Sequence, residues 1–314
     1  MSRPSKGRLL RAAHQSARPL ISPLAHDALS ARLIAAAGFP SFNIGGSTLL
    51  AARHALPDLG LAALGEMATA IRDVVDAVGI PCMADADDGY GDVKSVVQTV
   101  LTYERIGVGG LLLEDQGRSG KQPGAAAARS VIPVEDMVTK LRAALAARQT
   151  DTVIIARSDA VGVEGVDGAL RRAERYLATG ADGVFVAGLD TPEMFERVGR
   201  ALKGSWNMAA MFEGGATPFI PPRDLHAMGF TQIAYPMALM QRITGLLEQT
   251  LASLRLYGAG ETDGIAHADL LSPKGFRAAV AITAWNAIEA GEVDAAALQA
   301  QPATLSQAWA RTVD

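Results

Sequence analysis

The chain has 314 residues, of which 49% are hydrophobic and 20% charged, and its formal net charge is −4 at pH 7. This length fits one large α/β domain or two modest ones, and the apolar content allows a sizeable core. The small net charge gives no electrostatic reason to expect a nucleic acid or an acidic membrane surface as partner. No apolar run approaches the roughly 20 residues that a membrane span needs.

Cys82 is the single cysteine, so no disulfide can form within the chain. A chain without disulfides fits a reducing compartment. The first 18 residues carry five lysine or arginine residues and no acid, a pattern that faintly resembles a transit peptide. Residues 6–17 also have the pattern of an amphipathic helix. We therefore favour an ordinary lead-in helix and expect a cytoplasmic protein.

A short apolar run followed by a helical pattern recurs eight times along the chain. Short apolar runs bounded by Gly, Pro or polar residues are typical of strands buried on both faces. The predicted strands are residues 19–22, 42–45, 81–86, 110–114, 153–157, 183–186, 208–212 and 232–235. Predicted helices between them include residues 26–37, 64–78, 93–106, 134–147 and 166–179. Gly38, Gly79, Gly107 and Gly180 follow helices where a left-handed cap is common.

Strict alternation of strand and helix predicts a parallel sheet. Eight such units in about 240 residues match a closed (β/α)₈ TIM barrel. A doubly wound open sheet is the alternative, but no GxGxxG motif follows the first strand. Because no linker divides the chain, we expect a barrel over residues 1–260 and a C-terminal helical extension of the same domain over 261–314. That extension is predicted to form helices at 276–290 and 295–312.

Acidic residues cluster after the third predicted strand, in "PCMADADDGYGD". Catalytic side chains of such barrels come from the C-terminal ends of the strands. Since side chains alternate along a strand, Asp85 and Asp87 share the face that points into the barrel mouth, and Cys82 points outward to the helical layer. Capping of the next helix is the alternative role for these acids. We assign Asp88 and Asp92 to it, but capping does not explain Asp85.

The fourth predicted strand ends in "LLLEDQ", which places Glu114 or Asp115 at the same height. Neighbouring carboxylates in a closed mouth repel one another unless a cation neutralises them. Ligands that are all oxygen favour Mg²⁺, Mn²⁺ or Ca²⁺ over zinc. The sequence therefore predicts a divalent metal site, with Mg²⁺ as the first choice and Mn²⁺ as the second.

Two further strand ends carry groups that bind anions. Arg157 follows the buried run in "VIIARSDA", where a guanidinium pairs with acids of the mouth, grips a substrate carboxylate, or does both. The second strand ends in "FNIGGSTLL", where the backbone amides of Gly45, Gly46 and Ser47 offer a weaker anion-binding signal. The five histidines show no spacing that indicates a zinc site or a catalytic triad.

Taken together, these motifs resemble the isocitrate lyase/phosphoenolpyruvate mutase superfamily, nearest to its methylisocitrate-lyase-like and oxaloacetate-decarboxylase-like branches. The matching stretches are "AHDALSARLIAAAGF", "LPDLGL", "DADDGYG", "LLLEDQ", "VIIARSDA" and the "TP" of "EGGATP". They cover roughly residues 8–255 in the same order. Asp-Ala-Asp before Gly-Tyr-Gly, with a later Glu-Asp-Gln, is the most specific part.

The resemblance implies a Mg²⁺ site at Asp85, with Asp58, Asp87 and Glu114 in direct or water-mediated contact. It also implies a 2-oxo or 2-hydroxy acid chelated to the metal and a reaction through an enolate that the metal and arginine stabilise. The substrate carboxylate is then expected on Gly45, Gly46, Ser47 and Arg157. Glu213, a pocket residue of the family, is retained. Family members assemble by exchanging C-terminal helices, so we expect a homodimer or homotetramer.

The chain departs from the family pattern in the loop after the fourth strand. The lyase branch carries Lys-Arg-Cys-Gly-His there, whereas this chain reads "GRSGKQPGAAAARSV". Lys121 aligns with the lysine, but Pro123 and Ala125 stand where the cysteine and histidine would be. The Lys-x-Asn-Ser loop of the phosphonate mutases is also absent. Pocket positions differ too, at Ala187, Ala210-Met211-Phe212 and Gln241.

These changes remove the groups that would hold the distal carboxylates of a tricarboxylate, which are costly to bury unpaired. We therefore expect a substrate smaller than isocitrate or methylisocitrate, or one whose apolar tail meets Ala187, Ala210 and Phe212. The leading hypothesis is a Mg²⁺-dependent carbon–carbon lyase that decarboxylates an oxaloacetate-like acid or cleaves a substituted malate, with Tyr90 or Lys121 as base. The alternatives are a non-catalytic member that binds a 2-oxo acid, and the phosphorus–carbon chemistry of the mutase branch.

Overall fold

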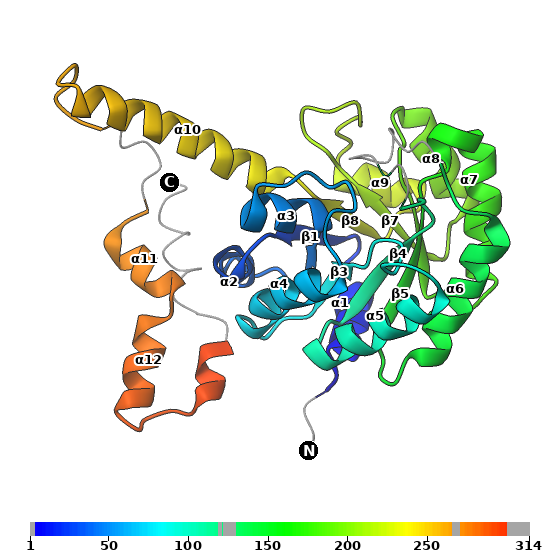
Figure 1. Cartoon of the computed structure of the whole chain (residues 1–314), viewed down its shortest axis with the longest axis horizontal. Coiled ribbons are helices and arrows are strands. Elements are labelled where there is room, and N and C mark those ends of the chain that lie inside the picture. The colour runs from blue at the N-terminus through cyan, green and yellow to red at the C-terminus, as the bar shows by residue number, and fades with distance from the viewer. Residues whose placement is uncertain (1–3, 119–120, 122–129, 266–270, 300–314) are drawn as a thin grey trace.

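The structure, a computed structural model that describes residues 4–118, 121, 130–265 and 271–299, contains a closed barrel of eight parallel strands (Figure 1). β1 pairs in parallel with both β2 and β8, which closes the barrel and rules out the open sheet. The predicted (β/α)₈ fold is therefore confirmed. The strands are β1 (Leu20–Ala25), β2 (Phe42–Ile44), β3 (Cys82–Asp85), β4 (Gly110–Glu114), β5 (Val153–Ser158), β6 (Gly183–Val186), β7 (Trp206–Ala210) and β8 (Gln232–Tyr235).

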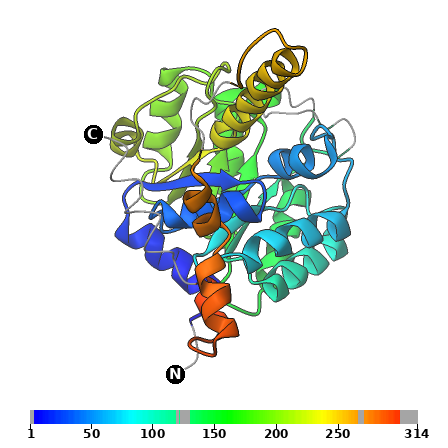
Figure 2. The ribbon, with the colours of Figure 1, turned by 90° about the vertical axis from the view of Figure 1, so that its left-hand side faces the viewer.

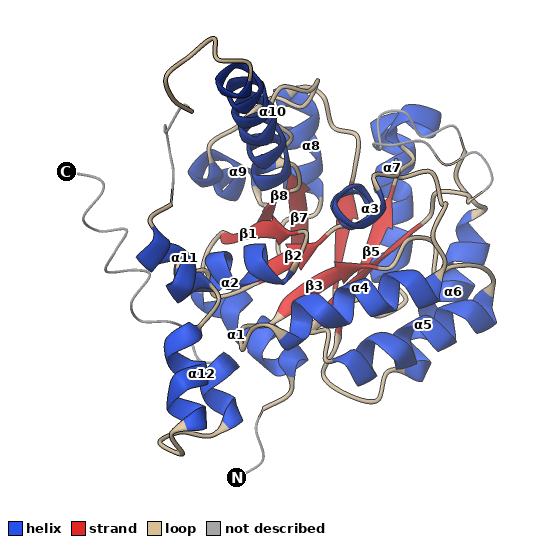
Figure 3. Ribbon diagram, turned by 60° about the vertical axis from the view of Figure 1, so that its left-hand side comes forward, coloured by secondary structure: helices blue, strands red, loops and turns tan. Residues whose placement is uncertain are grey.

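Helices surround the strands, as the secondary-structure colouring shows (Figure 3). Those that belong to the barrel region are α1 (Lys6–Ser16), α2 (Ala28–Ala36), α3 (Gly46–His54), α4 (Leu64–Asp76), α5 (Val93–Ile106), α6 (Val134–Ala147), α7 (Val161–Leu177), α8 (Pro192–Ala201) and α9 (Pro222–Met228). The chain continues into α10 (Ala238–Gly258), α11 (Pro273–Ala279), α12 (Ile282–Glu289) and a 3₁₀ helix, η2 (Ala295–Gln299). α3, directly after β2, was not predicted.

Two apolar layers follow from the alternation of side chains along the strands. Cys82 and Ala84 point outward and pack against the helices, as predicted for Cys82, whereas Met83 points into the barrel. Burial raises the pKa of the Cys82 thiol to about 12, so the thiol is protonated at neutral pH. The cysteine is thus a small core residue.

α1 covers the end of the barrel where the strands begin. Leu10 of this helix is fully buried and joins the inner apolar layer. His14 stacks on Trp206, the first residue of β7, with ring centroids 3.7 Å apart. Because α1 covers this end, the barrel is accessible from the opposite end, where parallel strands present their C-terminal residues.

Several local predictions need correction. Gly38, Gly107 and Gly180 have left-handed φ angles of 86°, 89° and 96°, but Gly79 does not, because α4 already ends at Asp76 and its cap Ala77 is right-handed. The single helix predicted at residues 276–290 is instead α11 and α12, separated where Ala281 takes a left-handed φ of 57°. The helix predicted at 295–312 begins as η2, and residues 300–312 lie outside the described part.

Within the described ranges, no helix is both long enough and apolar enough to cross a bilayer.

Candidate active site

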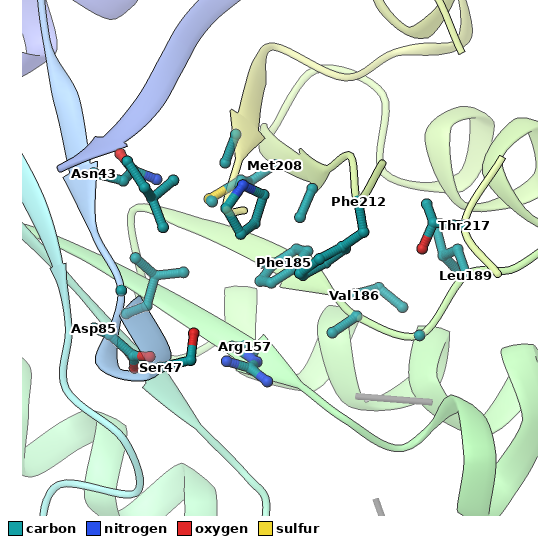
Figure 4. Close-up of a pocket in the computed structure, with 18 of the residues that line it drawn as sticks. Asn43, Ser47, Asp85, Arg157, Phe185, Val186, Leu189, Met208, Phe212 and Thr217 are labelled. Atoms are coloured by element: carbon teal, nitrogen blue, oxygen red, sulfur yellow. The ribbon is translucent and has the colours of Figure 1, made fainter. Parts of the chain in front are cut away.

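A cavity of about 470 Å³ opens at the C-terminal ends of the strands (Figure 4). Its polar side chains lie mainly on β2, β3 and β5, and apolar side chains from β6, β7 and β8 form the far wall. The residues that line the cavity include Leu24, Asn43, Ser47, Asp58, Asp85, Arg157, Phe185, Val186, Ala187, Leu189, Met208, Ala210, Phe212 and Ala234. The cavity is therefore polar at one end and apolar at the other.

Three carboxylates converge beside the polar end of this cavity. Asp85, Asp87 and Glu114 each offer an oxygen, and these oxygens lie within 4.8 Å of one another. β3 and β4 run in parallel with Asp85 opposite Leu112, and the Glu114 amide donates to the Asp87 carbonyl at 2.9 Å. Asp87 turns the chain with a left-handed φ of 49°. The turn keeps its carboxylate beside that of Asp85 although the strand has ended.

Lys121 places its ammonium among these acids. Its Nζ lies 3.2 Å from Asp58 Oδ1 and 3.2 Å from Glu114 Oε1, and it also contacts Asp87. Burial alone would lower the pKa of Lys121, but the surrounding carboxylates, Glu114 and Asp87 first, outweigh it and raise that pKa. Lys121 is thus held as a cation at the centre of the cluster.

Burial acts on the carboxylates as well. Burial, together with the neighbouring charge of Asp85, raises the pKa of Asp87 to about 6, although Lys121 opposes the shift. Burial also raises the pKa of Glu114 well above its usual value, against the charge of Arg157. These raised pKa values mean that added positive charge beside the cluster would stabilise the ionised carboxylates.

Arg157 connects the acidic cluster to the cavity. Its guanidinium lies 3.0 Å from Glu114 Oε2 and donates to Asp159 Oδ1 at 2.8 Å. It also lines the cavity and lies 5.7 Å from the centre of the Phe185 ring. Burial disfavours its charge, yet Asp159 and Glu114 raise the pKa of Arg157 overall. The arginine therefore pairs with acids and faces the cavity, the combination that the sequence had left open.

Alternation along β4 decides between Glu114 and Asp115. Glu114 points inward to the cluster, whereas Asp115 is fully buried on the outer side and accepts from Ser158 and Tyr176. Arg172 of α7 lies 3.3 Å from the same carboxylate. Asp115 therefore ties β4 to β5 and α7, and Glu114 is the acid at the mouth.

The glycines after β2 bring the backbone close to the acids. The Gly46 amide donates to Asp85 Oδ2 at 3.3 Å, and Gly45 and Ser47 line the cavity. A Cβ on Gly45 would lie only 2.8 Å from Leu24 Cδ2, so a side chain does not fit there. One of the three expected anion-binding amides is thus already engaged by Asp85.

Two candidate residues lie away from the cavity lining. The Tyr90 hydroxyl is hydrogen-bonded to Tyr103 at 2.9 Å, and Tyr103 donates to the Asp85 carbonyl. Glu213 accepts from Arg242 of α10, with one bond at 3.0 Å. Tyr90 is therefore linked through Tyr103 to the backbone of β3, and Glu213 connects the loop after β7 to α10.

The remaining acids of the "DADDGYGD" segment have separate roles. Asp92 caps α5 by accepting from the amides of Lys94 and Ser95, as predicted. Asp88 does not cap that helix, which corrects its assignment. It accepts from the Tyr90 amide and lies 3.3 Å from Arg118. The chain turns at Gly89–Gly91 before α5 begins, so Asp88 is too far from the helix end to cap it.

Three of the positions that depart from the family pattern lie in the apolar wall of the cavity. Ala187, Ala210 and Phe212 line the cavity together with Phe185 and Leu189. Met211 is buried on the outer side, and Gln241 lies on α10 outside the lining. Pro123 and Ala125 lie outside the described residues.

Asn43 is a cavity residue that the sequence reasoning missed. It is the middle residue of β2 and pairs with Met83, so strand alternation places it on the inward face of the barrel. The alternation rule that identified Asp85 would have found it. It was overlooked because a single asparagine in an apolar strand carries no recognised motif.

The residues at the acidic cluster fit a bound Mg²⁺. Both oxygens of Glu114 are buried; Lys121 Nζ lies 3.2 Å from one and Arg157 3.0 Å from the other, but neither oxygen accepts a hydrogen bond within the described part of the chain. The ammonium of Lys121 already lies among Asp58, Asp87 and Glu114, which shows that a cation is accommodated there. Oxygen-only ligands match Mg²⁺ or Mn²⁺. Asp85, Asp87 and Glu114 are the residues that would hold it.

The chain is similar in sequence to a known family and to named enzymes. The model of the family described as phosphoenolpyruvate phosphomutase matches residues 10–255. The 2,3-dimethylmalate lyase of Eubacterium barkeri is 36% identical over 220 residues, which cover 70% of this chain and 75% of that protein.

Solved structures agree with these sequence matches. A structure of oxaloacetate acetylhydrolase in complex with the inhibitor 3,3-difluorooxalacetate superposes with a TM-score of 0.84 at 28% identity, covering 93% of this chain and 98% of the other. A phosphonopyruvate hydrolase in complex with oxalate and Mg²⁺ gives a TM-score of 0.79 at 27% identity, covering 91% and 98%.

Proposed function

The chain belongs to the phosphoenolpyruvate mutase family, within the isocitrate lyase/phosphoenolpyruvate mutase superfamily, and we propose that it is a Mg²⁺-dependent lyase for a small 2-oxo or 2-hydroxy carboxylic acid. The relatives are named as lyases of small carboxylic acids, which supports a reaction that cleaves a carbon–carbon bond. The proposal depends on one observation: the cavity has the acidic cluster and Arg157 at one end and apolar side chains at the other.

The polar end of the cavity binds the carboxylate of the substrate. Arg157 presents a guanidinium whose charge is maintained by Glu114 and Asp159, and Gly45 and Ser47 line the same cavity. Asp85, Asp87 and Glu114 would hold a divalent cation, which would supply positive charge next to a developing enolate. Arg157, beside Glu114, provides a fixed positive charge that needs no reorganisation as negative charge develops on the substrate.

The apolar end favours a substrate with an uncharged tail. Phe185, Leu189 and Phe212 offer no partner for a second or third carboxylate, which would be costly to bury there. Cleavage of an alkyl-substituted malate, the type of substrate for which the Eubacterium relative is named, fits this wall. Decarboxylation of an oxaloacetate-like acid is the other reaction that the site supports.

Lys121 is the better placed of the two proposed proton carriers. Its ammonium contacts Asp58, which lines the cavity, whereas the Tyr90 hydroxyl is engaged by Tyr103. Since burial raises the pKa of Tyr90 well above its usual value, that hydroxyl is a weak acid at neutral pH. The carboxylates that raise the pKa of Lys121 make its ammonium a weak acid as well, so position alone favours Lys121 as the proton carrier, with Tyr90 as the alternative.

Turnover over a panel of 2-oxo and 2-hydroxy acids, with Mg²⁺ or Mn²⁺, tests the proposal. We expect activity on at least one alkyl-substituted malate or oxaloacetate-like acid, and its loss on chelation. Asp85→Asn keeps the shape of the side chain but removes its charge, so activity should fall about 10³-fold or more. Asp92→Asn is the matched control, because Asp92 is an exposed helix cap, and it should retain activity.

The proposal fails if the metal-loaded protein binds oxalate but turns over no member of the panel. That result would favour the non-catalytic binder. Turnover of phosphonopyruvate alone would favour the phosphorus–carbon chemistry of the mutase branch instead.

We also propose that the chain forms a homodimer or homotetramer in the cytoplasm, with residues 1–260 as the barrel and 261–314 as its helical extension. The apolar side chains exposed on α10 and α12 support the assembly. The single buried thiol, Cys82, is compatible with a reducing compartment.

A further inference from the structure

A chain of hydrogen bonds crosses the inside of the barrel below the cavity. Trp206 Nε1 donates to Gln232 Oε1 at 2.8 Å. Gln232 Nε2 donates to Ser22 Oγ at 3.0 Å and to Asn43 Oδ1 at 3.2 Å. Gln232 and Ser22 are fully buried, and Asn43 is 3% exposed. These four side chains come from β1, β2, β7 and β8, so the network is built from strands far apart in the sequence.

This network fixes the orientation of the Asn43 amide. An indole N–H can only donate, so the oxygen of Gln232 must face Trp206 and its nitrogen must face Asn43. The oxygen of Asn43 must then face Gln232, because the flipped amide would oppose two donors. The Asn43 nitrogen is consequently directed away from the network and toward the cavity.

The amide nitrogen of Asn43 has no acceptor within the described part of the chain. Figure 4 shows it nearer than the amide oxygen to the other labelled side chains of the cavity. Leu24 of β1 lies beside Asn43, and Met208 and Ala234 of the same cavity lining are also apolar. Asn43 therefore presents one directed donor on an otherwise apolar floor.

The register of the strands gives the depth of this donor. Asn43 pairs with Met83, while Asp85 of the acidic cluster lies two residues further along β3. Two residues of a strand span about 6–7 Å, so the donor lies that much deeper than the cluster. A substrate whose carboxylate end is held at the cluster would reach Asn43 with an atom three or four bonds away.

We infer that Asn43 is a specificity-determining residue that selects substrates with an oxygen acceptor on the distal carbon, with Gln232 and Trp206 as positioning residues. The inference rests on the proposed function for the end of the substrate that is held at the cluster. A ligand with a methyl group in place of that oxygen leaves the buried donor without a partner, which disfavours its binding.

Binding of a matched ligand pair tests this assignment without requiring turnover. With Mg²⁺ present, 4-hydroxy-2-oxobutyrate should bind the wild-type protein about tenfold more tightly than 2-oxopentanoate, which carries a methyl group in place of the hydroxyl. Asn43→Leu should abolish this preference and leave the affinity for oxalate, which is too short to reach Asn43, within about twofold. Asn286→Leu, on the exposed face of α12, is the control and should leave both values unchanged.

A second variant tests the role of the positioning residues, Trp206 and Gln232. Trp206→Phe removes the donor that orients Gln232, so the ligand preference should fall while the affinity for 2-oxopentanoate stays unchanged. A preference that is equal in the wild type and Asn43→Leu, or a wild-type protein that binds neither ligand, overturns the role of Asn43. A preference unaffected by Trp206→Phe overturns the role of the network. Turnover by the wild type in either case would leave the proposed lyase function standing.

Discussion

Lys121 illustrates how one side chain determines the charge of the whole acidic cluster. Its ammonium is nearly fully buried and faces Asp58, Asp87 and Glu114. Without a cation these carboxylates would repel one another in a site of low dielectric. Lys121 therefore stabilises the protein when no divalent metal is bound, and a bound metal would make that contribution redundant.

Replacement of this lysine should give a stability loss that metal restores. Lys121→Met is expected to lower the free energy of unfolding by about 3 kcal/mol in metal-free protein, because it leaves buried carboxylates unpaired. Saturating Mg²⁺ should recover most of the loss. Thermal or urea unfolding with and without Mg²⁺ measures both values.

Lys140→Met is the matched control for that experiment. Lys140 is also buried, but its Nζ donates to the Asp88 carbonyl at 2.7 Å and does not contact the cluster. Its replacement should destabilise the protein equally with and without Mg²⁺. Equal losses in both variants under both conditions would contradict the role assigned to Lys121.

At the scale of elements, α1 is joined to the barrel by an aromatic contact. His14 stacks on Trp206 and shares a hydrogen bond of 2.9 Å with Thr231. Burial and the charge of Arg18 lower the pKa of His14 from 6.5 to about 4. The same indole orients Gln232 and, through it, Asn43, so the packing of α1 supports the cavity at the other end of the barrel.

The lowered pKa of His14 makes the free energy of unfolding depend on pH between about 4 and 6.5. Between pH 6.5 and 4 the unfolded chain takes up a proton on His14 that the folded protein does not, so unfolding becomes more favourable as the pH falls. The full shift corresponds to about 3 kcal/mol, and partial exposure reduces the expected loss to about 1–2 kcal/mol. Urea unfolding at pH 7 and pH 4.5 should show a smaller difference for His14→Gln than for the wild type.

His54→Gln, on the exposed end of α3, serves as the control. It should leave the difference between the two pH values unchanged. An unaltered difference in His14→Gln as well would show that acid destabilisation arises elsewhere.

At the scale of the whole molecule, the C-terminal helices project from the barrel. Figures 1 and 2 show α10 extending away from the strands, with α11 and α12 beside the barrel. α10 has no buried residue and exposes an apolar stripe of Ile243, Leu246, Leu247, Leu251, Leu254 and Tyr257. Spacings of three and four residues place them along one face of the helix. An exposed apolar stripe of this length favours contact with another protein surface.

Assembly through α10 gives a prediction at this scale. The wild type should have a mass in solution that is two or four times the 32.7 kDa of the chain. Leu247→Glu combined with Leu251→Glu should yield monomers, because it places charges in the stripe. Light scattering coupled to size exclusion measures the mass. Leu61→Glu, equally exposed but away from α10, should not change it, and a wild-type monomer would refute the proposed assembly.

Most of the barrel could be predicted because its pattern is local. Each strand is a short apolar run and each helix has its own apolar face, so the eight units were found without knowledge of their contacts. The boundary at Val280–Ala281 and the α3 helix were missed, since a left-handed alanine and a short helix after Gly-Gly have no distinctive pattern. Asp88 was assigned wrongly because its position in the turn depends on the glycines that follow it.

What the sequence determined by itself was which face of β3 points into the mouth. Alternation along a strand follows from the covalent geometry of an extended chain, so Asp85 could be placed from its neighbours alone, whereas the end of β4 left Glu114 and Asp115 as alternatives. Tertiary structure decided how these groups are neutralised and oriented: Lys121 enters from a loop, and Trp206 orients Asn43 through Gln232. These contacts depend on packing between residues distant in the chain, and no local pattern encodes the distance or direction of such a contact.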